Sequence, residues 1–270
     1  MLESFNQSKG KMSNNAQGEE RDDMGRKKRL VSGIVCISFC LCLLTTQATE
    51  GIQLAAHRGG GMTEKENTLV AIKHVMEQPI RCIEIDVQLT KDRQVVLFHD
   101  ETVGQGAEEA RPLYTLTYAQ ILQRDGEIPT LRSALKLTKG KMPLLIELKA
   151  YGLREALIEK VIEDLKRYKM LDQVEICSFD RDLMIKLKHK EPTLKVGLIT
   201  SYSEKAMAEK ELDFVSLQYK AATEEIVDLL HQRGKRVYVW TVNQKEDMRL
   251  FHNMGVDLII TDRPLELKTP

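Results

Sequence analysis

The feature that most constrains the fold is a regular alternation of short apolar segments with amphipathic segments from residue 51 onward. The apolar segments have the length of buried strands, and the amphipathic segments have a helical period. We expect eight strands, at residues 52–57, 80–88, 143–149, 174–179, 194–200, 213–218, 236–241 and 256–261. We expect helices at residues 67–77, 131–138, 153–168, 182–189, 204–209, 223–233 and 244–254. This pattern predicts an α/β fold, a (β/α)8 TIM barrel, over residues 50–270.

One extra strand interrupts the alternation. Residues 95–98 follow the second strand too closely for a helical crossover, so the two strands should form a hairpin. With Thr90 opposite Val95, Gln88 lies opposite Leu97 and Asp86 opposite His99. The hairpin is therefore expected to bring an imidazole beside the second strand.

Two acidic residues on that apolar strand need an explanation. Glu84 and Asp86 are two residues apart, so they project from the same face about 6–7 Å apart. Unpaired carboxylates among Ile83, Ile85 and Val87 are costly unless a cation or hydrogen-bond donors satisfy them. Solvated edge residues are the alternative interpretation, but clusters of titratable groups at strand ends are more typical of a functional site.

Further polar residues end other predicted strands. His57 and Arg58 end the first strand, Glu147 and Lys149 end the third, and Trp240 lies near the end of the seventh. Barrel enzymes carry their active sites at the carboxyl ends of the strands, so we expect all these side chains at one mouth.

The motifs that carry these residues resemble those of the glycerophosphodiester phosphodiesterases. The match runs from Gln53 to Pro264, with every motif in order. The matching motifs are His57-Arg58-Gly59, Glu66-Asn67-Thr68, Glu84 with Asp86, His99-Asp100, Glu147 with Lys149, and Trp240.

The resemblance implies a role for each residue. Three carboxylates with no nearby cysteine favour one hard divalent cation, Ca²⁺ or Mg²⁺. The implied metal ligands are Glu84, Asp86 and Glu147; the implied catalytic acid and base are His57 and His99, in either order; the implied substrate-binding residues are Arg58, Lys149 and Trp240. Arg58 and Trp240 also fit a structural role, and Lys149 fits a salt bridge to Glu147. Asn67 fits a helix cap, and Glu66 a partner that orients Arg58.

Two segments precede the barrel. Residues 1–29 are polar and charged, which predicts a disordered tail. Residues 30–46 form an uncharged run that follows Arg26-Lys27-Lys28-Arg29. As a helix this run is about 25 Å long, and the hydrocarbon core of a membrane is about 30 Å thick. The run is therefore expected to be a signal anchor or a signal peptide that contacts the membrane as an N-terminal helix.

The two interpretations place the protein differently. An uncleaved anchor leaves the basic tail in the cytoplasm and makes a single-pass membrane protein with an extracytoplasmic catalytic domain. Cleavage near Ala48 would release a secreted enzyme. A buried core helix fits the run least well. Cys82 and Cys177, each in a separate strand, are interpreted as small buried hydrophobes.

Charge and motifs together narrow the function. The 40 basic and 40 acidic residues balance, which argues against a nucleic-acid partner. We expect hydrolysis of a small glycerophosphodiester to glycerol 3-phosphate and an alcohol, as the resemblance implies. One alternative is a lysophospholipase D or phospholipase-type enzyme in the same fold, which should expose an apolar rim, whereas residues 101–127 are mostly polar. A more distant alternative is a membrane-tethered binding barrel without turnover.

Overall fold

A computed structural model describes residues 51–60, 64–104 and 106–265. Its main sheet contains eight parallel strands, and β1 pairs with both β2 and β11, so the sheet closes into a barrel. The strands are β1 (Leu54–Ala56), β2 (Cys82–Leu89), β6 (Leu144–Leu148), β7 (Val174–Ser178), β8 (Lys195–Thr200), β9 (Phe214–Gln218), β10 (Arg236–Trp240) and β11 (Leu258–Thr261). The predicted TIM barrel is confirmed.

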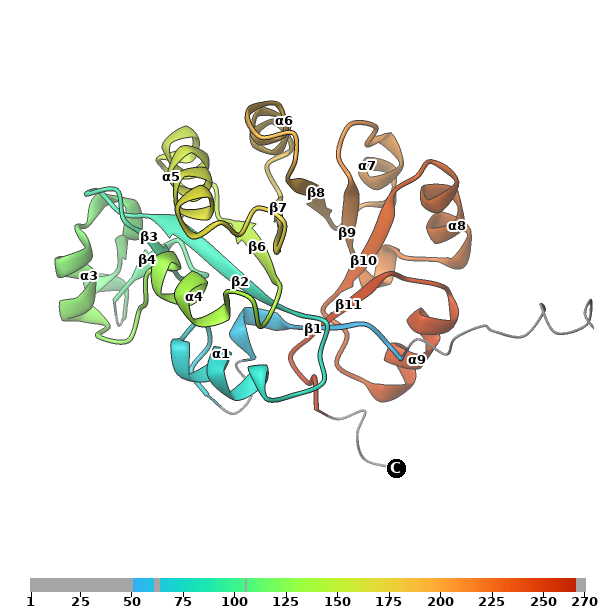
Figure 1. The fold of residues 1–270 in the computed structure, drawn as a ribbon, viewed down its shortest axis with the longest axis horizontal. Coiled ribbons are helices and arrows are strands. Elements are labelled where there is room, and N and C mark those ends of the chain that lie inside the picture. Colours follow the sequence, from blue (N-terminus) through green and yellow to red (C-terminus); the bar gives the residue numbers. More distant parts are fainter. Residues whose placement is uncertain (1–50, 61–63, 105, 266–270) are drawn as a thin grey trace, which may run out of the picture. The chain divides into compact units, whose positions relative to one another are not determined.

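Helices lie outside the ring of strands (Figure 1). They are α1 (Leu69–Met76), α4 (Leu131–Thr138), α5 (Arg154–Tyr168), α6 (Arg181–Lys190), α7 (Ser203–Ala208), α8 (Glu224–Gln232) and α9 (Lys245–Asn253). Each matches an expected helix to within a few residues. The prediction that Asn67 caps the first helix is wrong, because Thr68 is the cap and its hydroxyl accepts from the Ala71 amide at 3.2 Å.

The core has two layers because strand side chains alternate between the two faces of the sheet. Outward side chains pack against the helices, and inward ones fill the barrel. Inside, Phe214 stacks on Tyr238 with ring centroids 4.5 Å apart, and a Cβ on Gly197 would lie 2.2 Å from the Phe214 ring. Cys82 and Cys177 are buried in this inner layer as expected, and burial raises the pKa of the Cys82 thiol to about 12.

The predicted hairpin is present, but its expected register is wrong by one residue. The strand β3 (Val95–Leu97) is antiparallel to β2, and Val87 rather than Gln88 lies opposite Leu97. A shift of one residue reverses which face each side chain occupies, so His99 is not the partner of Asp86.

The loop of the hairpin explains the shift. Arg93 adopts a left-handed conformation with φ of 62°, and the Thr90 amide donates to the Gln94 carbonyl at 3.0 Å. This geometry closes a three-residue loop, one residue shorter than expected. Phe98 therefore faces Asp86, and the Phe98 amide donates to the Asp86 carbonyl at 3.1 Å.

The segment that follows the hairpin forms a small structure of its own. It contains β4 (Thr102–Val103), α2 (Gly106–Glu109), β5 (Arg111–Pro112) and α3 (Tyr118–Arg124). Its apolar side chains pack around Val96 of β3, so they cover the hairpin. This packing positions the hairpin, and with it His99, beside the barrel.

Within the described residues, no helix combines the length and apolar character that crossing a membrane requires. The predicted tail at residues 1–29 and the predicted membrane helix at residues 30–46 both lie outside those residues.

Candidate functional site

Three buried acidic side chains meet at the carboxyl end of the barrel. Glu84 and Asp86 lie on β2, and Glu147 on the neighbouring strand β6 is the register partner of Asp86. Each residue offers one carboxylate oxygen, and these three oxygens lie within 4.8 Å of one another. The shared inward face that the two-residue spacings predicted is therefore present.

Lys149 is the cation built into this acid cluster. Its ammonium lies 2.6 Å from Glu147 Oε1 and 3.0 Å from Asp86 Oδ1. Burial lowers the pKa of this ammonium, but the two carboxylates outweigh burial and raise it above its ordinary value. Lys149 therefore stays charged and neutralises part of the cluster.

The acids respond differently to these surroundings. Burial and the charge of Asp86 raise the pKa of Glu84 to about 8. Burial also raises the pKa of Glu147, although Lys149 opposes it. For Asp86, burial is outweighed by Lys149 and by a hydrogen bond from Asn67, so its pKa is lowered. Ionising all three acids would therefore place more negative charge in the pocket than Lys149 alone balances.

Asn67 holds Asp86 in place from the loop before α1. Its side-chain amide donates to Asp86 Oδ2 at 2.9 Å, and its carbonyl oxygen accepts from the Asp86 amide at 3.1 Å. Asn67 is buried and adopts a left-handed conformation with φ of 56°. The residue therefore positions an acidic side chain instead of capping a helix.

His57 lies at the end of β1, and its ring is held by the end of β11. His57 Nδ1 is 2.6 Å from Asp262 Oδ1, and Asn243 Nδ2 donates to Asp262 Oδ2 at 2.7 Å. Nε2 is left facing the acids, 4.0 Å from Glu84 Oε2. Burial lowers the pKa of His57, but the hydrogen bond to Asp262 and the charge of Glu84 outweigh it and raise the pKa.

His99 reaches the site through Arg58 and not through pairing with Asp86. Arg58 Nη2 lies 2.9 Å from His99 Nε2, and His99 Nδ1 lies 2.8 Å from Asp100 Oδ1. A guanidinium can only donate, so Nε2 must accept and Nδ1 must carry the proton given to Asp100. The contacts therefore fix the tautomer and orientation of this ring.

Arg58 connects the two histidines with the acid cluster. Its backbone amide donates to Glu84 Oε2 at 2.7 Å, and its Nη1 donates to both oxygens of Glu66 at 3.2 and 3.1 Å. The expectation that Glu66 orients Arg58 is confirmed. Arg58 Nε is buried and has no hydrogen-bond partner among the described residues.

A cavity of about 170 Å³ lies among these side chains. Its lining combines charged side chains with apolar ones, among them Phe179, Ile199 and Trp240. The Trp240 indole donates to the Ser216 carbonyl at 3.1 Å, and the Phe179 ring meets the Trp240 ring edge-on at 5.6 Å. The structure thus brings together all the side chains that the sequence placed at the mouth.

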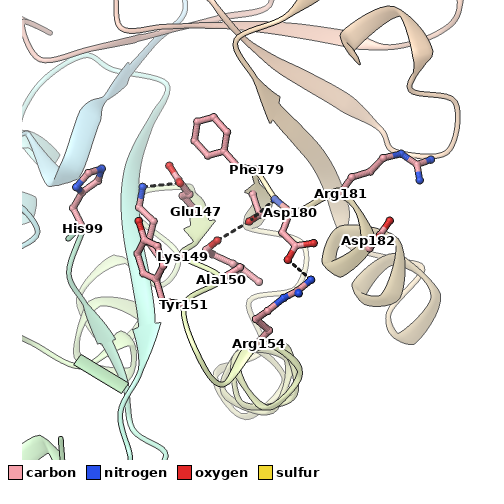
Figure 2. A pocket seen from close by; sticks show the side chains of 12 residues that line it. His99, Glu147, Lys149, Ala150, Tyr151, Arg154, Phe179, Asp180, Arg181 and Asp182 are labelled. Carbon is pink, nitrogen blue, oxygen red and sulfur yellow. Dashed lines mark hydrogen bonds and ion pairs between the residues drawn. The ribbon is translucent and has the colours of Figure 1, made fainter. Parts of the chain in front are cut away.

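A larger polar groove of about 670 Å³ opens beside this cavity. Figure 2 shows His99, Glu147 and Lys149 on one side of it and Asp180, Arg181 and Asp182 on the other. Arg154 forms an ion pair with Asp180 in this groove. Both spaces share His99, Glu147, Lys149 and Phe179, so the polar groove extends the cavity.

The acid cluster fits a hard divalent cation. All three donors are oxygens, and Glu84 Oε1 is buried without a hydrogen-bond partner in the described part of the chain. Cys177 also lines the cavity, but burial holds the pKa of its thiol well above the usual range, so it stays protonated and is a poor ligand. Oxygen donors of this charge suit Ca²⁺ or Mg²⁺.

The sequence patterns did not predict the roles of Asp262 and Asn243. They also did not predict that Asp100 fixes the tautomer of His99 through Nδ1. Asp262 is 205 residues from His57, and the two meet only because β1 pairs with β11 when the barrel closes. One signal was present, since Asp262 directly follows the last predicted strand, at the same edge of the barrel as His57.

Comparison with known sequences identifies the family. A model of the glycerophosphoryl diester phosphodiesterase family matches residues 57–266. A glycerophosphodiester phosphodiesterase of Caldanaerobacter subterraneus subsp. tengcongensis is 35% identical over 226 residues, which cover 77% of this chain and 93% of that protein. A human lysophospholipase D is 25% identical over 266 residues, covering 79% of this chain and 84% of that protein.

Solved structures agree. A glycerophosphodiester phosphodiesterase of Thermotoga maritima has a TM-score of 0.68 at 27% identity, and the match covers 80% of this chain and 97% of that protein's chain. An Oleispira antarctica phosphodiesterase, solved with the product sn-glycerol-3-phosphate, has a TM-score of 0.71 at 24% identity, with 80% and 95% covered, and supports the fold. The chain belongs to the glycerophosphoryl diester phosphodiesterase family and is a phosphoric diester hydrolase.

Proposed function

We propose that this enzyme hydrolyses glycerophosphodiesters to glycerol 3-phosphate and an alcohol, with a divalent cation and two histidines. One observation carries the proposal: three carboxylates have oxygens within 4.8 Å of one another, and two of them, Glu84 and Glu147, line a cavity that His57 and His99 also line. The family and its glycerophosphodiester phosphodiesterase relatives support the substrate class.

Glu84, Asp86 and Glu147 would hold the cation, Ca²⁺ or Mg²⁺. Once bound, the ion would polarise a phosphate oxygen and offset the negative charge of the transition state. The unpartnered Glu84 Oε1 supports this role, because a buried carboxylate oxygen without a partner is costly. Asn67 and Lys149 keep Asp86 ionised, as a metal ligand must be.

His57 and His99 would carry out acid and base catalysis. Asp262 orients His57 through Nδ1, Asp100 orients His99 through Nδ1, and both histidines line the cavity. One ring would take a proton from the attacking nucleophile and the other would protonate the leaving alcohol.

Arg58 and Lys149 would bind the phosphate. The Arg58 fork is oriented by Glu66, and both cations line the cavity. Trp240 would wall the glycerol moiety, and its ring is fixed by the Ser216 carbonyl. The polar groove would then accept the alcohol that leaves.

The test is release of glycerol 3-phosphate by the purified full-length chain. Several water-soluble glycerophosphodiesters should be compared before and after treatment with a chelator and after addition of Ca²⁺ or Mg²⁺. We expect activity that the chelator removes and one of the two ions restores. Full activity in the chelated sample would contradict the metal-dependent mechanism, and no product from any glycerophosphodiester would contradict the substrate class.

We also propose that residues 30–46 anchor the protein in a membrane, with the barrel outside the cytoplasm. The apolar run and the preceding basic cluster Arg26-Lys27-Lys28-Arg29 support this arrangement. Mass spectrometry of the mature amino terminus tests it. A terminus at or near residue 49 would show cleavage and support secretion instead.

A further inference from the structure

A second, apolar groove adjoins the catalytic cavity, with which it shares Phe179 and Ile199. We call it the apolar groove; its volume is about 380 Å³. Its lining residues are Phe179, Arg181, Leu198, Ile199, Thr200, Ser201, Tyr202, Lys205 and Ala208, from the ends of β7 and β8 and from α7. It therefore lies at the same mouth as the catalytic side chains.

Two large aromatic side chains are exposed along this groove. The exposed fraction is 53% for Phe179 and 60% for Tyr202. Among the described residues, the other exposed large hydrophobics are the aliphatic Val70, Leu122, Leu153 and Leu250. Scattered aliphatic exposure is ordinary, whereas two exposed aromatics that line one concave surface indicate a binding site for an apolar group.

The apolar groove is continuous with the apolar part of the lining of the catalytic cavity. Phe179 and Ile199 line both spaces, and Phe179 contacts Trp240 edge-on. The cavity itself, at about 170 Å³, is smaller than the roughly 300–1,000 Å³ that ligand pockets usually have. A substrate larger than a small glycerol diester must therefore extend into one of the two adjoining grooves.

Charge distinguishes the two grooves. The polar groove includes Asp180 and Asp182, whereas none of the described residues that line the apolar groove is acidic. Of its two basic residues, Arg181 is bound by Glu209 and Glu211, and the Lys205 ammonium lies over the Tyr202 ring, 5.3 Å from its centroid. The apolar groove therefore offers hydrocarbon contact and no partner for a cationic head group.

We propose that the apolar groove binds an acyl or alkyl chain attached to the glycerol half of the diester. This inference rests on the proposed function, since it places the phosphate against the charged side chains of the cavity and the glycerol carbons against Trp240. The chain then leaves the glycerol past Phe179 and lies against Tyr202 and Ala208. The apolar rim expected of a lipid-cleaving enzyme is thus on the β7 and β8 loops and not in residues 101–127.

The first test is binding of products, which does not depend on turnover. Calorimetry should compare glycerol 3-phosphate with a short-chain 1-acyl-glycerol 3-phosphate, both below micelle-forming concentrations, on the full-length chain in the presence of Ca²⁺ and, separately, of Mg²⁺. We expect the acyl product to bind at least about tenfold more tightly, which is the discrimination that one or two methylene groups provide in an apolar pocket. Equal affinities would overturn the proposal.

The second test fills the groove. Ala208 is exposed in the groove, and Ala208→Trp adds bulk without removing a contact. The matched control is Ala119→Trp, at an exposed alanine on α3 in the polar segment 101–127. Ala208→Trp should remove the affinity advantage of the acyl product, and Ala119→Trp should keep it. An advantage unchanged in Ala208→Trp would overturn the proposal.

Turnover separates this inference from the proposed function. The same three proteins should be assayed with glycerophosphocholine and with its short-chain 1-acyl derivative. We expect the ratio of kcat/KM for the acyl substrate to that for glycerophosphocholine to fall about tenfold in Ala208→Trp alone. If all three proteins hydrolyse both substrates and the ratio of kcat/KM values is the same in each, the proposed chain-binding role of the apolar groove is contradicted and the proposed function stands. If neither substrate is hydrolysed, the proposed function is contradicted. The comparison of product affinities then still tests whether the apolar groove binds an acyl chain.

Discussion

Acidic side chains gather at both ends of the barrel, but their surroundings differ. At the amino end, Asp213 accepts hydrogen bonds from Lys188 at 2.7 Å and from the Val196 amide at 2.9 Å. Burial raises the pKa of Asp213, but these donors outweigh burial and lower it. At the carboxyl end, burial and Asp86 raise the pKa of Glu84 to about 8.

Other acids at the amino end are satisfied in the same way. Asp257 accepts from the Val237 amide at 2.7 Å and lies 2.8 Å from His231 Nε2, and Glu175 pairs with Arg236 at 2.7 Å. Charge alone therefore does not mark a site. At the amino end the fold supplies a partner for each of these carboxylates, whereas at the mouth it leaves a carboxylate oxygen for a ligand.

The largest expected effect comes from removing a charge at the mouth. Glu84→Gln or Asp86→Asn should lower kcat by about 10³-fold or more, because a bound cation supplies several kcal/mol of charge stabilisation. Steady-state assays of glycerol 3-phosphate release give the loss, and a large excess of Ca²⁺ or Mg²⁺ should restore part of it. Activity close to that of the unmodified enzyme in either variant would remove the acid cluster from the mechanism.

Removing either imidazole should also be severe without affecting the fold. His57→Ala and His99→Ala should each lower kcat by roughly 10²- to 10⁴-fold, the range for proton-transfer groups, with little change in metal affinity. The double variant should lose much less than the sum of the two effects in activation free energy. Full additivity would show that the two rings do not act in one mechanism.

Asp262 should affect the pH profile as well as the rate. Asp262→Asn should lower kcat by about 10- to 100-fold, as expected for a residue that orients a functional imidazole. The hydrogen bond from His57 to Asp262 helps to raise the pKa of His57, so its loss should lower that pKa. The limb of the pH–rate profile that reports His57 should therefore move to lower pH. A smaller kcat with an unmoved profile would mean that Asp262 acts only through packing.

The smallest expected effect on activity is at the amino end. Asp213→Asn should lower the free energy of unfolding by about 1–3 kcal/mol and leave kcat of the folded enzyme nearly unchanged. The pKa of Asp213 is lower in the folded state, so its contribution is present above the unfolded pKa of about 3.9 and is lost as pH falls through the folded pKa.

Urea unfolding at a series of pH values measures this contribution. The difference in free energy of unfolding between Asp213→Asn and the unmodified protein should be largest near neutral pH and should disappear in acid. A gap that widened as the pH fell would contradict the assignment of Asp213 as a paired carboxylate.

Much of the fold followed from the sequence because the barrel repeats one local pattern. All eight predicted strands are present. Glu84 and Asp86 share the inward face because they are two residues apart on β2, and Glu147 joins them because it is the register partner of Asp86 on the adjacent strand β6. The register of the hairpin could not be predicted from the sequence, because one residue in a left-handed conformation, Arg93, shortens the loop.

The supporting residues of the site were harder to predict for a different reason. Asn67 could satisfy a helix end or an acid, and only the tertiary structure decides between them, since Thr68 takes the cap. Asp262 meets His57 only when the last strand closes on the first. Local patterns therefore predict the strands and their faces, whereas contacts between distant strand ends require the closed barrel.

Calorimetric titration of Ca²⁺ and of Mg²⁺ into the chelator-treated full-length enzyme measures whether the acids at the mouth form a cation site. The unmodified protein, Glu84→Gln and Asp213→Asn should be compared under the same conditions. If the mouth acids are arranged for a cation and the amino-end acids are not, the unmodified protein and Asp213→Asn will bind one ion with similar affinity, and Glu84→Gln will bind it far more weakly. Equal binding by Glu84→Gln and the unmodified protein would contradict that account.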